Sequence, residues 1–175
     1  MGDNENQQSV NPDADTTQET LDAEMVMPMF LSSFSHALDA KSRVVVPSVY
    51  REGLGKDFVI APSLDFECVA FYPKAVWERE IQRMYRKAQK SISVGGRILE
   101  QFSTLSFPGQ ECDSQGRCLL PARAKQVYLG DVKEVVIAGR MDYVLIKAQD
   151  KAEETDRSFM ENKAELLRQM DMIED

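Results

Sequence analysis

HALDAKSRVVVP, residues 36–47, and QECDSQGRCLLP, residues 110–121, share one pattern. In each segment an aspartate is followed four residues later by an arginine, then three apolar residues and a proline. The matched positions are Asp39 with Asp113, Arg43 with Arg117 and Pro47 with Pro121, and all three pairs are 74 residues apart. Each segment continues into a short basic stretch, a Leu-Gly pair and two apolar runs. The chain therefore contains two copies of one small unit.

The aspartate–arginine pair is predicted to lie on a turn between two strands. Val44–Val46 favour a strand, and Pro47 forbids a helix from continuing past them. Two interpretations stay open at this point. The side chains of Asp39 and Arg43 pair and fix the turn, or Arg43 is presented outward to bind a phosphate or a guanine edge, with Lys41 beside it. The repetition of the pattern in both copies favours the second interpretation.

The remaining pattern predicts the same order of elements twice. The first copy is expected to have strands at 34–38 and 43–46, a helix at 48–54, strands near 57–61 and 67–72, and a helix from Pro73 to about Lys90 that Gly95-Gly96 breaks. The second copy is expected to have strands near 102–112 and 117–120, a helix at 122–129, strands at 134–139 and 142–147, and a final helix at about 150–171. A unit of about 45 residues rarely stabilises itself by burial alone. We therefore expect both copies to form one pseudo-symmetric α+β domain.

Charge is distributed unevenly along the chain. Residues 1–25 hold seven acids and no base, and residues 151–175 hold eight acids and four bases. Although the net charge of the chain is −8, the residues between these two acidic ends, 26–150, include more bases than acids. This central part can therefore bind phosphate. The predicted division is an acidic disordered extension at 1–28, a first module at 29–96, a second module at 97–150, and a C-terminal helix and tail at 151–175.

Other candidate sites are weaker. Cys112 and Cys118 flank a turn but lack the spacing and partners of a metal site, so we favour buried free thiols for them and for Cys68. His36 has no catalytic partner evident in the sequence and is expected to be packed or to stabilise a turn. No apolar run reaches the roughly 20 residues that cross a bilayer, and no phosphate-binding loop or nucleophile elbow is present in the sequence. We expect a cytoplasmic protein that is not an enzyme and has no cofactor, metal or small-molecule substrate.

Two helices carry stripes whose role the sequence leaves open. On the helix from Pro73 an apolar stripe is expected to face the core. The opposite stripe is cationic, and it is either a solvated face or a phosphate contact; it consists of Arg79, Arg83, Arg86 and Lys90. The C-terminal helix has a weak heptad-like seam, which predicts packing on its own module or on a neighbouring subunit.

The run MFLSSFSHALDAKSRVVVPSVYREGLG, with the later VAFYPKAVWE and DSQGRCLLP, resembles the MraZ family of bacterial regulators over about residues 29–150. The resemblance implies two tandem AbrB-like swapped-hairpin modules. It also implies a ring-shaped homo-oligomer on the nucleoid that binds direct repeats in double-stranded promoter DNA. Such a ring is expected to repress a division and cell-wall gene cluster that includes its own gene. One departure is Ser42, which stands where this family usually has glycine.

The expected DNA contacts follow from the resemblance and from the cations around the two turns. They are Lys41, Arg43, Arg51, Arg117, Arg123 and Lys125. Asp39 and Asp113 are expected to orient the loops. The alternative is an oligomeric interaction scaffold that binds a protein partner through the acidic extension or the C-terminal helix.

Overall fold

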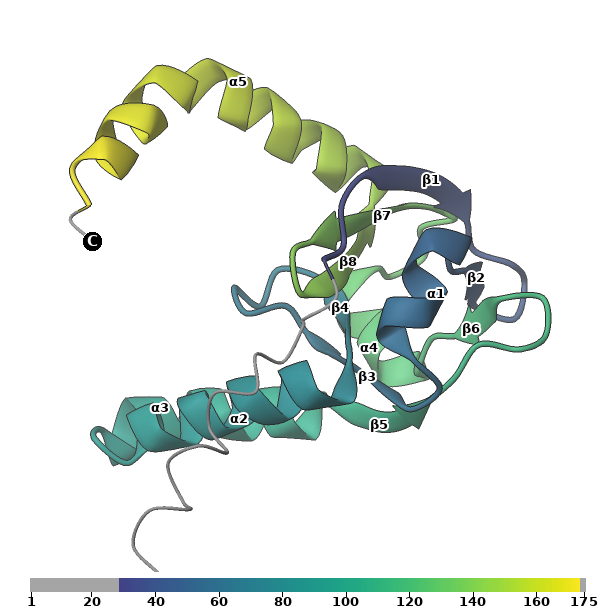
Figure 1. The fold of residues 1–175 in the computed structure, drawn as a ribbon, viewed down its shortest axis with the longest axis horizontal. Helices are drawn as coiled ribbons and strands as arrows, with labels where there is room; N and C mark the ends of the chain where they lie inside the picture. Colours follow the sequence, from purple (N-terminus) through teal and green to yellow (C-terminus); the bar gives the residue numbers. More distant parts are fainter. Residues whose placement is uncertain (1–28, 174–175) are drawn as a thin grey trace, which may run out of the picture.

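The computed structural model describes residues 29–173, so the predicted acidic extension at 1–28 lies outside the described residues. The first copy of the repeated unit contains β1 (Ser33–Ala37), β2 (Arg43–Val45), α1 (Ser48–Leu54), β3 (Phe58–Pro62), β4 (Val69–Tyr72) and α2 (Lys74–Ala88). The second contains β5 (Phe107–Gln110), β6 (Arg117–Leu119), α4 (Ala122–Tyr128), β7 (Glu134–Arg140), β8 (Tyr143–Ala148) and α5 (Gln149–Asp171). An additional helix, α3 (Ile92–Thr104), connects α2 to β5 along the chain and lies beside α2 (Figure 1).

The strands are exchanged between the two copies. One antiparallel sheet has the order β1-β7-β8-β4-β3-β5, and a separate two-stranded ribbon pairs β2 with β6. Strand β1 of the first copy therefore borders the second copy, and β5 of the second copy borders the first. Neither copy can complete its sheet or its ribbon alone. This arrangement confirms the α+β fold with two swapped-hairpin modules in one domain and a C-terminal helix.

A pseudo-twofold axis passes through the centre of the sheet and of the ribbon. In the ribbon Val44 lies opposite Cys118, its own counterpart 74 residues later. In the sheet Ala70 lies opposite Leu145, and the neighbouring pairs are Val69 with Ile146 and Phe71 with Val144. Because the corresponding strands of the two copies pair with each other in both the sheet and the ribbon, the sequence repeat becomes a geometric repeat.

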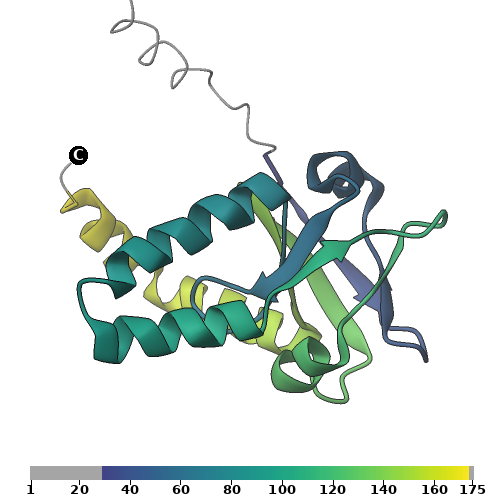
Figure 2. The ribbon, with the colours of Figure 1, turned by 90° about the horizontal axis from the view of Figure 1, so that it is seen from below.

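The central strands are buried on both faces, which explains their continuous apolar runs. Every residue of β3 and β4 is buried. One face of the sheet packs on the ribbon, α1 and α4, with Ile60, Phe71 and Ile146 in that core. The opposite face packs on α2 and α3, with Tyr72 and Phe102 in a second core. The α2–α3 pair lies at the end of the molecule opposite the ribbon (Figure 2).

Most predicted elements are confirmed within one or two residues, but the region around 91–112 was predicted wrongly. The Gly95-Gly96 pair does not break a helix, since both glycines lie within α3, and β5 begins only at Phe107. A Cβ placed on Gly95 would lie 2.5 Å from the Cα of Ala88, the last residue of α2. The glycine is thus required for close approach of the two helices where the chain turns back.

Candidate nucleic-acid interface

The β2–β6 ribbon places both arginines of the repeated pattern on one face. Val44 and Cys118 point into the core, so their neighbours on each strand point the other way. The outer face consists of Arg43, Val45, Arg117 and Leu119, with Arg43 opposite Leu119 and Val45 opposite Arg117. Arg43 and Arg117 are therefore diagonal neighbours across the ribbon. Residues at such diagonal positions have Cα atoms about 7–8 Å apart. One molecule therefore displays two arginines on one face of the ribbon, each turned toward the aspartate of its own turn, together with two exposed apolar side chains.

Asp39 organises the first turn completely. Its Oδ1 accepts the backbone N–H groups of Lys41 and Arg43, both at 2.9 Å. Its Oδ2 accepts the Nε–H of Arg43 at 2.7 Å, and Nη2 of the same guanidinium lies 2.7 Å away. The backbone of Asp39 closes the hairpin, because its N–H donates to the carbonyl of Arg43 at 3.0 Å. The turn is therefore held by one carboxylate.

The second turn repeats this network. Oδ1 of Asp113 accepts the N–H groups of Gln115 and Arg117 at 2.9 Å, and Oδ2 accepts the Nε–H of Arg117 at 2.8 Å. The hydrogen bonds from the backbone of Arg43 and Arg117 are the main cause that lowers the pKa of Asp39 and Asp113, respectively. Both carboxylates are therefore charged at neutral pH.

The two interpretations of the aspartate–arginine pair are compatible in this geometry. The pair does fix the turn, and the side chains of Arg43 and Arg117 nevertheless remain 28% and 32% exposed. A guanidinium has five N–H donors, and the aspartate occupies only those on one edge. The other donors can reach a ligand that approaches the outer face of the ribbon.

Arg51 holds the second turn from behind. It lies on α1 of the first copy, and its Nε–H donates to the carbonyl of Val46 at 2.8 Å. Its guanidinium covers Gly116, where any Cβ would overlap it. Lys125 on α4 is the counterpart of Arg51 and lines a shallow depression together with Ser42. The sequence offered no signal that Arg51 would cover Gly116 or that Lys125 would lie near Ser42, because each of these pairs joins residues of different copies.

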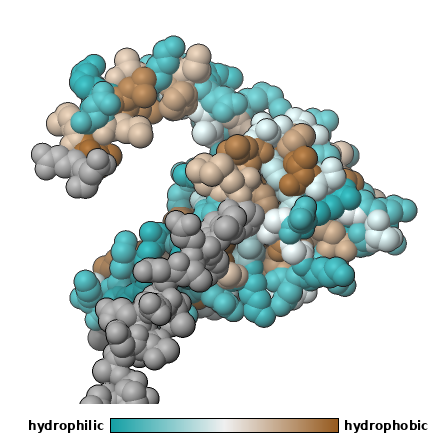
Figure 3. All heavy atoms as spheres, in the orientation of Figure 1, coloured by the Kyte–Doolittle hydropathy of each residue, from teal (hydrophilic) through white to brown (hydrophobic). Residues whose placement is uncertain are grey.

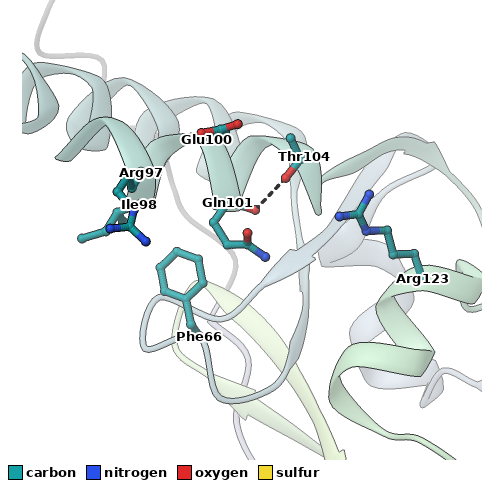
Figure 4. Close-up of a pocket in the computed structure, with 7 residues that line it drawn as sticks. All are labelled: Phe66, Arg97, Ile98, Glu100, Gln101, Thr104 and Arg123. Atoms are coloured by element: carbon teal, nitrogen blue, oxygen red, sulfur yellow. Dashed lines mark hydrogen bonds between the residues drawn. The ribbon is translucent and has the colours of Figure 1, made fainter. Parts of the chain in front are cut away.

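Arg123 is separated from the ribbon face. It lines a cleft of about 610 Å³ between α3, α4 and the β3–β4 turn, on the side of Gln101 and Thr104 and across from Phe66 and Arg97 (Figure 4). Lys41, in contrast, is exposed at the tip of the first turn. The structure thus brings Lys41, Arg43 and Arg117 together, places Arg51 and Lys125 against the turns, and leaves Arg123 on another surface.

Two of the four cations in the stripe on α2 form ion pairs within the molecule. The buried carboxylate of Glu80 pairs with Arg79 and with Arg83, each at 3.0 Å, and Arg79 also pairs with Asp142. Only Arg86 and Lys90 of the predicted stripe form no such pair among the described residues. Since α2 also lies far from the ribbon, it is not part of the candidate interface.

Three further observations limit the other kinds of site. Within residues 29–173 no three His, Cys, Asp or Glu side chains are grouped closely enough to hold a metal ion. His36 is half-buried on β1, opposite Val135. Among the described helices, none combines the length and apolar character needed to span a membrane.

The exchanged strands and the arginine-bearing ribbon define an AbrB-like swapped-hairpin protein. Residues 29–92 match the family model described as "MraZ protein, putative antitoxin-like". A protein of Clostridium beijerinckii named transcriptional regulator MraZ is 35% identical over 133 residues, which cover 74% of this chain and 89% of that protein. Proteins of the same name from Symbiobacterium thermophilum (35% identity, 69% of this chain, 85% of that protein) and Natranaerobius thermophilus (36%, 70% and 83%) are similar. The chain belongs to the MraZ family.

Proposed function

We propose that this protein is a sequence-specific DNA-binding transcriptional regulator whose β2–β6 ribbon enters the major groove. The observation that carries the proposal is that Arg43 and Arg117 lie on one outer face of the ribbon. Each is held by the aspartate of its own turn, through equivalent hydrogen bonds. The major groove of B-DNA admits a two-stranded ribbon, and arginine is the side chain that most often reads guanine there. The relatives named as transcriptional regulators support the same assignment.

The six predicted contact residues take different roles in this proposal. Lys41, Arg43 and Arg117 touch DNA directly, because they lie on the ribbon face or at its tip. Arg51 and Lys125 support the turns and add positive charge near the phosphates. Arg123 is the least supported contact, since it faces another cleft. Asp39 and Asp113 orient the arginines and do not touch DNA.

The target and the assembly follow from the family resemblance. The protein would act as a ring that binds promoter direct repeats spaced by about one helical turn, with one subunit on each repeat. Contacts that are weak individually then combine through multivalency. The genes controlled would be a division and cell-wall cluster that includes the protein's own gene, with repression as the outcome. No step of this activity is catalytic.

A mobility-shift assay on the DNA upstream of the protein's own gene tests the proposal. Arg43→Ala and Arg117→Ala should each keep the fold and weaken binding by about 1–3 kcal/mol, because each removes one guanidinium from the DNA-facing side of the ribbon. Arg86→Ala is the matched control, because it removes one exposed cation at the opposite end of the molecule. Equal binding by wild type and both ribbon variants would remove the ribbon from the interface.

Helix α5 favours a second candidate function, an oligomeric scaffold for a protein partner. Every residue from Glu153 to Ile173 is exposed, including large apolar side chains such as Phe159 and Leu166. Figure 3 shows hydrophobic patches along this projecting helix. Titration of the protein with operator DNA at two salt concentrations separates the DNA-binding function from the scaffold function. DNA binding through several cations must weaken as the salt concentration rises.

A further inference from the structure

Cys112 and Cys118 flank the turn that carries Arg117, and their side chains share one face of the hairpin. The N–H of Asp113 donates to the carbonyl of Arg117 at 2.9 Å, so these two residues lie opposite each other. Their side chains pair on the outer side. Since side chains alternate along extended chain, the residues just before and just after this pair both point inward.

The burial of the two thiols agrees with this geometry. Cys118 is 1% exposed and Cys112 is half-buried, and both belong to the core beneath the ribbon. Residues that face each other across two antiparallel segments have Cα atoms about 4.5–5.5 Å apart. Disulfides span Cα separations of about 4.4–6.8 Å. The backbone thus permits a cross-strand disulfide, although both thiols are free in the structure.

The first copy shows what packing alone requires at these positions. The counterparts of Cys112 and Cys118 are Leu38 and Val44. Val44 is fully buried and Leu38 is half-buried, and both belong to the same core as the thiols. Apolar side chains therefore suffice for the fold, and the second copy differs by carrying a pair of sulfur atoms. The third cysteine, Cys68, lies in the other core.

We propose that Cys112 and Cys118 form a reversible disulfide under oxidising conditions, and that this bond weakens the binding of DNA by the ribbon. The bond itself depends only on the hairpin geometry. Its effect on DNA rests on the proposed function. In a reducing compartment such a bond would be transient, as redox-sensing disulfides are.

The reaction with a low-molecular-weight disulfide such as oxidised glutathione proceeds by two exchanges. The more exposed Cys112 loses its proton and attacks one glutathione sulfur, which forms a mixed disulfide and releases one glutathione thiolate. The sulfur of Cys118 then loses its proton and attacks the sulfur of Cys112, which releases the second glutathione thiolate. The two protons end on the two glutathione molecules. Two protein thiols are oxidised and one glutathione disulfide is reduced.

Burial makes this exchange slow. It raises the pKa of the Cys112 thiol, an effect that the nearby Arg51 charge partly offsets, and it raises the pKa of Cys118 to about 12. The thiolate is the attacking form, so little of it is present at neutral pH. The proposed switch therefore responds to sustained oxidation and not to a brief pulse.

The bond would change the ribbon through Cys118. This residue pairs with Val44 at the pseudo-twofold axis. Arg43 directly precedes Val44 on β2, and Arg117 directly precedes Cys118 on β6. Drawing its sulfur toward Cys112 removes it from a close-packed position and displaces β6 against β2. The two guanidinium groups then lose their common spacing on the outer face.

The disulfide is tested on full-length protein with Cys68→Ala as the background. Incubation with oxidised glutathione should remove the mass of two hydrogen atoms without adding glutathione. Trypsin cleaves after Arg117, so the bond should join peptide 98–117 to peptide 118–123. Reduction with dithiothreitol should release both peptides. Stable glutathione adducts, or two unlinked peptides, would overturn the proposal.

The effect on DNA is measured in parallel with reduced and oxidised protein. The oxidised form should bind the upstream DNA about tenfold more weakly, an effect equal to that of removing one DNA-binding side chain. The matched control is Cys112→Leu with Cys118→Val, which restores the residues of the first copy and should bind equally under both conditions. A mapped disulfide with unchanged DNA affinity would reject the regulatory effect. Failure of reduced wild type to bind DNA would instead reject the proposed function and leave the mapped bond standing.

Discussion

Ser42 and Gly116 occupy the same left-handed position in the two aspartate turns, with φ angles of 61° and 75°. The left-handed region costs a residue with a Cβ about 1–2 kcal/mol, whereas glycine adopts it freely. The serine that stands where the second copy has glycine therefore keeps the same turn geometry but strains it. The strain lies directly beside Arg43.

Ser42→Gly should therefore stabilise the protein. Relief of the strain exceeds the extra entropy that glycine gives the unfolded chain, so the free energy of unfolding should rise by up to about 1 kcal/mol. Urea unfolding of the reduced protein measures the change. The counterpart substitution Gly116→Ser should lower stability by about 1–2 kcal/mol, because it adds the same strain and displaces the guanidinium of Arg51. Changes of the same sign in both variants would contradict a strained serine at this position.

The turn carboxylates should respond to acid in a defined window. Backbone hydrogen bonds lower the pKa of Asp39 from its ordinary value of 3.8, so its contribution to stability is complete above that value. The contribution is lost as pH falls through the lower, folded-state pKa. The Nε–H resonance of Arg43 in an NMR titration should therefore shift with a midpoint below pH 3.8. A midpoint at or above that value would show that the turn is not closed in solution.

At the scale of elements, the repeated turn explains why most of the fold could be predicted. Its determinants are local: a carboxylate that accepts N–H groups two and four residues later, and a proline that ends the strand. Helix α3 could not be predicted, because Gly95 owes its place to close contact with Ala88 and not to its helix propensity. The contact between Arg51 and Gly116 escaped prediction for a similar reason, since it depends on how the two copies interlock.

Helix α2 offers a test of which arginines are structural. Arg79 joins the buried Glu80 to Asp142 on the β7–β8 turn, so its removal leaves a carboxylate without one partner. Arg79→Ala should lower the free energy of unfolding by about 1–3 kcal/mol, since a buried group loses a charged hydrogen bond. Arg86→Ala on the same helix should change it by less than about 0.5 kcal/mol. Thermal and urea denaturation measure both, and equal effects would show that the Glu80 network contributes nothing.

At the scale of the whole molecule, α5 cannot account for its own stability. A helix in a protein gains most of its stability from packing against other elements. Helix α5, however, buries none of its residues. Leu166→Asp should therefore reduce the size of the proposed ring assembly, measured by light scattering. Ser158→Asp adds the same charge to a residue that is already polar and exposed on the same helix, and it should leave the size unchanged. A monomer of unaltered size in wild type and both variants would exclude α5 as a subunit contact.

For the proposed DNA interface, the salt dependence of binding should separate the roles of two kinds of cation. Arg43 is already paired with Asp39, so it brings little net charge to a phosphate but still offers a fork of donors to a base edge. Lys41 forms no ion pair within the described part of the chain and brings a full charge. Lys41→Ala should weaken binding to all sequences and reduce the slope of log K against log salt by about 1 for each lysine removed.

Arg43→Ala should instead leave that slope nearly unchanged and reduce the preference for the operator over unrelated DNA. Fluorescence anisotropy with an operator duplex and a scrambled duplex, across a salt series, measures the slope and the preference together. If Arg43→Ala weakens both duplexes equally, Arg43 contacts phosphate, and the sequence must be read elsewhere. The exposed Val45 and Leu119 on the same face would then be the remaining candidates, because apolar side chains can contact thymine methyl groups.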